Sequence, residues 1–74
     1  MTGSELRAQV RAIMERTSLT YYMVASASGV SPSTTRFLLK MAEGEELRGD
    51  AHAKLEAFIR KNAAAMARGE VRFV

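Results

Sequence analysis

The chain has 74 residues and no cysteine, so it is one small domain near the lower limit for independent folding, without disulfides or thiolate metal sites. Its formal charge of +3 and its pI near 9.8 permit a polyanionic partner without requiring one. No apolar run approaches the roughly 18 residues of a membrane span, and no basic segment followed by an apolar one opens the chain, so we expect a soluble, unexported protein of the cytoplasm.

Charge is unevenly placed along the chain. Residues 1–40 hold five basic residues against two acidic ones, and three glutamates, Glu43, Glu45 and Glu46, follow directly. This placement predicts a domain with one positive end and a negative loop beside it. Ordinary solvated helix faces give the same pattern, so charge alone does not choose between the two interpretations.

Residues 4–16 are expected to form an amphipathic helix. Thr2 and Glu5 have the spacing of a capping box at its start. Its apolar residues recur at helical spacing and share one face: Leu6, Val10, Ile13 and Met14. Its arginines fall elsewhere on the cylinder and should face solvent or a ligand: Arg7, Arg11 and Arg16. Thr17 and Ser18 prefer caps and turns, so the helix should end there.

Two short helices joined by a tight turn are expected next, over residues 21–28 and 32–42. The pattern is an N-cap, a turn glycine, and a second N-cap with proline at the first helical position: Thr20, Gly29, Ser31 and Pro32. Leu19 and Val24 have the spacing of a hydrophobic staple, which fixes how the chain enters the first helix.

The two short helices have distinct apolar and polar sides. Val24 and Ala25 are the expected core positions of the first helix. The apolar side of the second helix is predicted to contain Thr35, Leu38, Leu39 and Met41. Arg36, Phe37 and Lys40 lie together on another side. Arg36 and Lys40 repel each other at the i, i+4 spacing, which is slightly unfavourable unless a negative group lies nearby.

Residues 43–49 contain two glycines and no periodicity, so we expect a loop. Asp50 is expected to cap a helix from residue 51 to about 68, about 27 Å long, whose alanine-rich second half should extend beyond the core. Its apolar face is predicted to contain Ala51, Leu55, Phe58, Ile59, Asn62 and Met66. Gly69 should end it. His52 has no clustered ligand-type residues in sequence and is expected at the surface.

The last residues change character. Val71 and Phe73 alternate with Arg72 and Val74 in a strand-like pattern, and a single strand needs a partner that a second copy would supply. A frayed terminus is the alternative. We therefore expect one all-α domain over residues 1–74, with four helices, a central helix-turn-helix, a long C-terminal helix, and a dimerisation strand or tail at 69–74. The expected dimer contacts are Met66, Val71 and Phe73.

Ten residues of the helix-turn-helix carry a family pattern: Leu19, Thr20, Val24, Ala25, Gly29, Val30, Ser31, Ser33, Thr34 and Leu38. The stretch resembles the DNA-binding domain of phage repressors and Cro proteins, the Xre-like family, over about a third of the chain. Three features depart from the family. Thr35 stands where the family places Ile or Val, Pro32 stands where relatives often carry a base-reading side chain, and the second helix is longer by about one turn.

The resemblance implies a small, phage-related transcriptional regulator that binds double-stranded DNA as a homodimer, with the 32–42 helix in the major groove of an inverted-repeat operator. Repression by occupying a promoter and activation through RNA polymerase or another regulator both fit. Arg36 is the main candidate for base reading, because its guanidinium can grip guanine O6 and N7. The other expected DNA contacts are Tyr21, Tyr22, Ser31, Ser33, Thr34, Phe37 and Lys40. For Tyr22 and Phe37 a place in the core is the open alternative.

Two further classes of function stay open. A protein-interaction module would use the same helices with the acidic loop at 43–46. An architectural or recombination accessory protein would bend DNA with less sequence preference. An enzyme is not expected, because the chain has one histidine, no cysteine and no acid pair beside a plausible nucleophile, and no metal or cofactor is expected either.

Overall fold

The computed structural model describes the backbone of residues 1–67 and the side chains of residues 1–62. Over that part the chain folds into four helices and no strand: α1 (Gly3–Thr17), α2 (Tyr21–Ser28), α3 (Pro32–Lys40) and α4 (Ala51–Ala67). The expected all-helical class and helix number are confirmed for this part. The predicted strand at 69–74, with Val71 and Phe73, and the side chain of Met66 lie outside the described residues.

The first helix begins with the capping box that the sequence predicts. The Oγ1 atom of Thr2 accepts a hydrogen bond from the Glu5 N–H at 3.1 Å, and the Glu5 carboxylate accepts one from the Thr2 N–H at 2.9 Å. The hydrogen bond from the Thr2 backbone stabilises the carboxylate form and lowers the pKa of Glu5. The helix ends before Ser18, which adopts the left-handed conformation with φ 58°.

The connection between α2 and α3 also follows the predicted local chemistry. Thr20 Oγ1 accepts a hydrogen bond from the N–H of Met23 at 3.2 Å, and α2 ends at Gly29 with φ 78°. The N–H of Gly29 donates to the Ala25 carbonyl at 3.0 Å. Ser31 Oγ then accepts from the Thr34 N–H at 3.2 Å, so only three residues separate the end of α2 from the start of α3.

The end of α3 differs from the prediction. The helix ends at Lys40 rather than residue 42, and Met41 already has extended backbone with ψ 143°. Arg7 donates to the Met41 carbonyl and contacts the Glu43 carboxylate at 2.8 Å, while Arg11 donates to the Leu39 carbonyl. The expectation that Arg7 faces solvent or a ligand is therefore wrong, because its side chain is only 19% exposed. Arg11 is exposed as expected, although both arginines bind the end of α3. They satisfy the carbonyl groups that the end of a helix leaves without partners.

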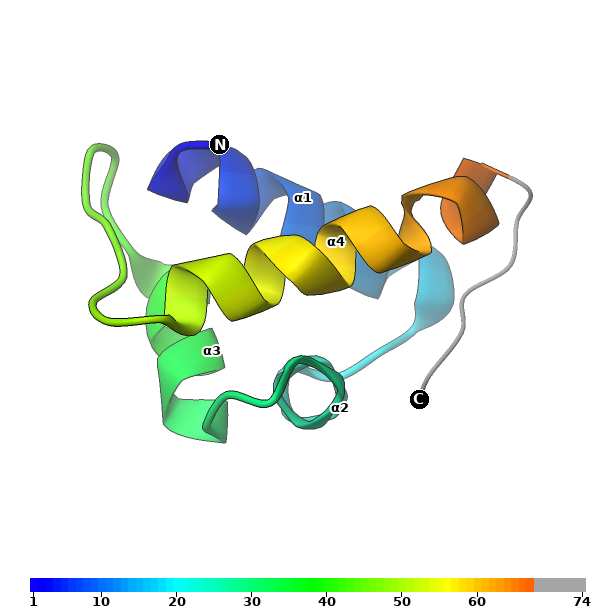
Figure 1. Cartoon of the computed structure of the whole chain (residues 1–74), viewed down its shortest axis with the longest axis horizontal. Helices are drawn as coiled ribbons and strands as arrows, with labels where there is room; N and C mark the ends of the chain where they lie inside the picture. The colour runs from blue at the N-terminus through cyan, green and yellow to red at the C-terminus, as the bar shows by residue number, and fades with distance from the viewer. Residues whose placement is uncertain (68–74) are drawn as a thin grey trace.

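One core joins all four helices. α2 packs on α3 and α4, and α1 packs on α3 and α4. Figure 1 shows α4 running along α1, with α2 seen end-on and α3 lying across the view, so the axes of α2 and α3 are far from parallel. The buried apolar side chains of this core are Leu6, Val10, Ile13, Leu19, Val24, Leu38, Met41, Leu55, Phe58 and Ile59. Each fully buried leucine or isoleucine contributes about 1.5–3 kcal/mol through burial.

Two polar residues lie inside this core. Thr35 is fully buried, as its predicted place on the apolar side requires, and its Oγ1 atom has no hydrogen-bond partner. Asn62 is 1% exposed, and its Nδ2 atom donates to the Phe58 carbonyl at 2.8 Å. An unpaired buried hydroxyl is destabilising, so Thr35 is a weak point in the packing of α3.

The loop between α3 and α4 closes on the start of α1. The Gly3 N–H donates to the Glu46 carboxylate at 2.8 Å, and a Cβ atom at position 3 would overlap the carbonyl oxygen of Glu45. Glu46 also lies 3.8 Å from the imidazole of His52, which is partly buried, and Glu56 approaches the same ring at 3.7 Å. The glycine at position 3 thus permits a close approach that a larger residue would block.

Candidate nucleic-acid interface

One face of α3 is buried and the opposite face is open. Thr35 and Leu38 are fully buried, whereas Arg36, Phe37 and Lys40 are exposed. The side chain of Phe37 is 51% exposed. The core alternative for Phe37 is therefore excluded, and a large aromatic ring stands on the open face next to two cations.

These exposed residues gather around a shallow hollow. Ser33, Arg36, Phe37 and Lys40 line a depression of 250 Å³ on the outer side of α3. The hollow combines one hydroxyl, two cationic side chains and one apolar ring. Those groups can meet phosphate oxygens, base edges and a thymine methyl group, so the surface has the chemistry that major-groove contact requires.

Arg36 is positioned by an aromatic ring from the preceding helix. Its guanidinium carbon lies 5.6 Å from the centroid of the Tyr21 ring, at the range of a cation–π contact. Tyr21 is partly buried at the first position of α2, and Arg36 is exposed in the second turn of α3. The sequence predicted both residues as DNA contacts but not the contact between them.

The predicted hydroxyl groups divide into two kinds. Ser31 and Thr34 share a hydrogen bond between their hydroxyls at 2.8 Å, and Ser31 also caps α3. Both therefore have a structural task in the turn. Ser33 is exposed on the open face and makes no hydrogen bond with its side chain among the described residues, so it is the hydroxyl that can turn to a ligand.

The start of α2 adds a second exposed surface. Tyr22 is 63% exposed and Met23 is 49% exposed. The core alternative for Tyr22 is therefore excluded as well. Tyr22 carries its hydroxyl at the N-terminal end of α2, where backbone N–H groups favour anions.

The charged residues on α2, α3 and the segments that flank them are all basic. No acidic residue occurs between Glu15 and Glu43, a stretch that contains all of α2 and α3 together with Arg16, Arg36 and Lys40. The acidic residues of the next loop are already engaged inside the chain. Glu43 pairs with Arg7, Glu45 accepts from the Ala42 N–H at 2.8 Å, and Glu46 accepts from the Gly3 N–H.

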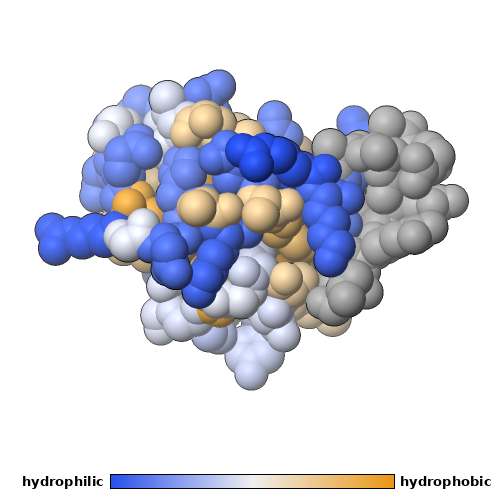
Figure 2. All heavy atoms as spheres, in the orientation of Figure 1, coloured by the Kyte–Doolittle hydropathy of each residue, from blue (hydrophilic) through white to orange (hydrophobic). Residues whose placement is uncertain are grey.

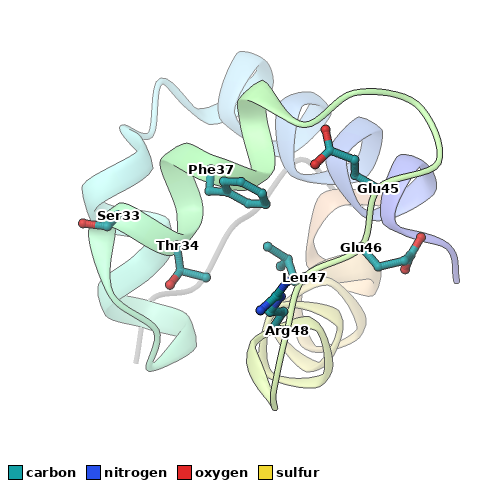
Figure 3. A pocket seen from close by; sticks show the side chains of 7 residues that line it. All are labelled: Ser33, Thr34, Phe37, Glu45, Glu46, Leu47 and Arg48. Atoms are coloured by element: carbon teal, nitrogen blue, oxygen red, sulfur yellow. The ribbon is translucent and has the colours of Figure 1, made fainter.

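A larger groove separates α3 from that loop. Its volume is 660 Å³, and its walls are formed by Ser33, Thr34, Phe37, Glu45, Glu46, Leu47 and Arg48. Figure 3 shows Phe37 from α3 and Leu47 from the loop turned toward one another across the hollow, with Ser33 pointing away from it. The loop beside the open face of α3 thus carries both signs of charge, from Glu45, Glu46 and Arg48.

Leu47 and Arg48 are the residues of this surface that sequence reasoning missed. They lie in a stretch without periodicity, and their place opposite α3 depends on the path of the loop after Met41. The only sequence signal was their position directly after the second helix of the helix-turn-helix. Within the described residues, no group of three or more His, Cys, Asp or Glu side chains is placed to hold a metal ion, and no helix is long and apolar enough to span a bilayer.

The chain was compared with protein-family models, curated proteins and solved structures. No protein-family model, no curated protein and no solved structure matches the chain.

Proposed function

We propose that this protein binds double-stranded DNA sequence-specifically, as a small homodimeric transcriptional regulator that represses by occupying an inverted-repeat operator. The observation that carries the proposal is the open face of α3. A short helix that is anchored by buried Thr35 and Leu38 presents Arg36, Phe37 and Lys40 outward, in a stretch without acidic residues. A helix presented in this way fits the major groove.

Each exposed residue of α3 has a distinct task in this proposal. Arg36 reads guanine through O6 and N7, and Phe37 packs on a thymine methyl group. Ser33 bonds a base edge or a phosphate with little discrimination. Lys40, one turn after Arg36, binds phosphate and contributes affinity rather than specificity.

The start of α2 and the end of α1 fix the docking on the DNA backbone. The exposed Tyr22 residue and the first N–H groups of α2 meet one phosphate, and the exposed Arg16 in the last turn of α1 supplies a further phosphate contact. Contacts of this kind set the register of the protein without reading sequence.

A protein-interaction module is less well supported. That alternative needs the acidic loop as a free docking surface, but the carboxylates of Glu43, Glu45 and Glu46 all have hydrogen-bond partners inside the chain. Figure 2 shows the side of the molecule on which α4 lies as mainly hydrophilic, with apolar atoms in small separate patches. That side offers little area for a helix partner. An architectural or recombination accessory protein would bind DNA with less sequence preference than the proposed regulator, so sequence selectivity distinguishes the two.

Salt dependence tests the proposal directly. Binding of a labelled random duplex pool is measured between 50 and 200 mM salt, and the affinity should fall steeply, with a slope of log K against log salt of about −0.9 for each phosphate neutralised. Lys40→Ala should reduce that slope by about 1, whereas Arg60→Ala, an exposed arginine on α4, should leave it unchanged. An affinity that does not respond to salt would remove DNA as the partner.

A further inference from the structure

Arg36 contacts an aromatic ring of the protein and donates no hydrogen bond to a described residue. Its guanidinium carbon lies 5.6 Å from the Tyr21 ring centroid. Among the described residues no carboxylate lies within 4.0 Å of its nitrogens and none of its N–H groups donates a hydrogen bond to the protein. The one contact that fixes this side chain therefore leaves all of its donors available.

Two other arginines lie near α3, and both donate hydrogen bonds to the protein. Arg7 donates hydrogen bonds to the Met41 carbonyl and the Glu43 carboxylate, and Arg11 donates one to the Leu39 carbonyl. These hydrogen bonds satisfy carbonyl groups at the end of α3, and a base that took over the same donors would remove them. Arg36 differs from both, because it contacts the Tyr21 ring and none of its N–H groups donates to a described residue.

A cation–π contact and bidentate hydrogen bonding can be made by one guanidinium at the same time. The first is an attraction between the cationic charge and the face of the ring, whereas the second uses two N–H groups as donors to guanine. An exposed arginine otherwise loses several rotatable bonds when it binds, and a side chain that is already held loses less. The ring of Tyr21 can therefore lower the entropic penalty of base reading.

We propose that Tyr21 is a positioning residue that holds the guanidinium of Arg36 over its ring in the free protein and thereby sets the strength of guanine discrimination. The inference rests on the proposed DNA-binding function. It changes the role expected for Tyr21 from a phosphate contact through the hydroxyl to an aromatic platform that acts through Arg36.

The first part of the test needs no DNA. Proton NMR of the free protein should show the Arg36 side-chain protons shifted upfield by the ring current of Tyr21, relative to those of the exposed Arg60. Tyr21→Phe keeps the ring and should keep this shift. Tyr21→Leu removes the ring and should abolish it, while Tyr22→Leu, the matched control one residue along α2, should leave it unchanged. Thermal unfolding of each variant establishes that the fold is retained.

The second part measures discrimination between a duplex selected by the wild-type protein and the same duplex with the guanine read by Arg36 replaced. Tyr21→Phe should discriminate as the wild type does, whereas Tyr21→Leu should lose about two- to fivefold, the range of an exposed cation–π contact. The salt slope should not change, because no phosphate contact is removed. In the Arg36→Ala background, Tyr21→Leu should have no further effect.

The outcomes separate the inference from the function it rests on. Equal losses in Tyr21→Phe and Tyr21→Leu with a reduced salt slope would show a phosphate contact and overturn the positioning role. An unshifted Arg36 spectrum, or a Tyr21→Leu effect that persists in the Arg36→Ala background, would overturn it as well. If no duplex is selected by the wild-type protein, the proposed function fails together with the inference, whatever the free-protein spectrum shows.

Discussion

Neighbouring residues on α3 have opposite surroundings, because one helical turn carries both a core face and an open face. Thr35 is fully buried and the next residue, Arg36, is exposed. Periodicity in the sequence predicted this division for both. It did not place Phe37, because an aromatic ring fits a core as well as a surface, and only its exposure of 51% in the folded chain distinguishes the two.

Arg36→Ala should remove sequence-specific binding and leave the fold intact. The expected loss of discrimination at the guanine is about 1–3 kcal/mol for each half-site, because a bidentate contact is lost. Competition binding between the selected duplex and a duplex with that base replaced measures the loss. Arg60→Ala is the matched control, since its side chain is 73% exposed and lies on α4. An unchanged preference in Arg36→Ala would eliminate Arg36 as the reader.

Thr35→Val should stabilise the protein. The substitution removes a buried hydroxyl that has no hydrogen-bond partner and keeps the shape of the side chain, so unfolding should cost about 1 kcal/mol more. Chemical denaturation measures the difference. Thr17→Val is the control, because the Thr17 hydroxyl donates to the Ile13 carbonyl at 2.6 Å and its loss should bring no gain. A destabilised Thr35→Val variant would mean that the hydroxyl finds a partner.

Helix starts were predictable from the sequence, and the end of α3 was not. The three N-caps, Thr2, Thr20 and Ser31, bond groups within three residues, so the local sequence contains the whole interaction. The end of α3 depends on Arg7, which lies 34 residues from the Met41 carbonyl that it binds. No local pattern contains such a contact, so the sequence prediction extended the helix to residue 42.

Arg7→Ala should destabilise the protein by about 1–3 kcal/mol, because the Met41 carbonyl loses its donor in a partly buried site and the exposed Glu43 carboxylate loses its ion-pair partner. Faster amide hydrogen exchange near the end of α3 should accompany the loss. Arg16→Ala serves as control, since Arg16 lies in the last turn of the same helix, is exposed, and makes no ion pair within the described part of the chain. Equal stability of the two variants would contradict the capping role of Arg7.

The part of the candidate site that lies in the loop before α4 could not be predicted from the sequence either. Glycine content predicted a loop, but the groove between Phe37 and Leu47 depends on the path of that loop, which is held against α1 by the Gly3–Glu46 and Arg7–Glu43 contacts. The residues on α3 could be predicted because a helix fixes their spacing. Leu47 and Arg48 could not, because a loop does not fix which way its side chains point.

At the scale of the whole molecule, a domain this small must use several copies or several contacts to be selective. One α3 helix carries a single arginine on its open face. Two copies related by a two-fold axis would present two such helices, with half-sites about 34 Å apart. The proposed inverted-repeat operator follows from this need for a second reader.

Deletion of residues 70–74 should shift the protein toward monomer and weaken its affinity for a selected operator. The reason is the strand-like pattern of Val71 and Phe73, which needs a partner strand. Analytical ultracentrifugation measures the shift. Replacing the charged side chains of the same segment, with Glu70→Gln and Arg72→Gln, leaves the apolar positions in place and should preserve the dimer. A shortened chain that sediments like the full one would rule out this strand as the dimer contact.

Selection of bound sequences from a random duplex pool, carried out in parallel with the wild-type protein and Arg36→Ala, tests whether α3 reads DNA. The wild type should yield a palindromic consensus with a conserved guanine in each half, and Arg36→Ala should lose that guanine. A wild-type pool without any consensus, or a consensus that is unchanged in Arg36→Ala, would contradict the claim that the open face of α3 reads DNA.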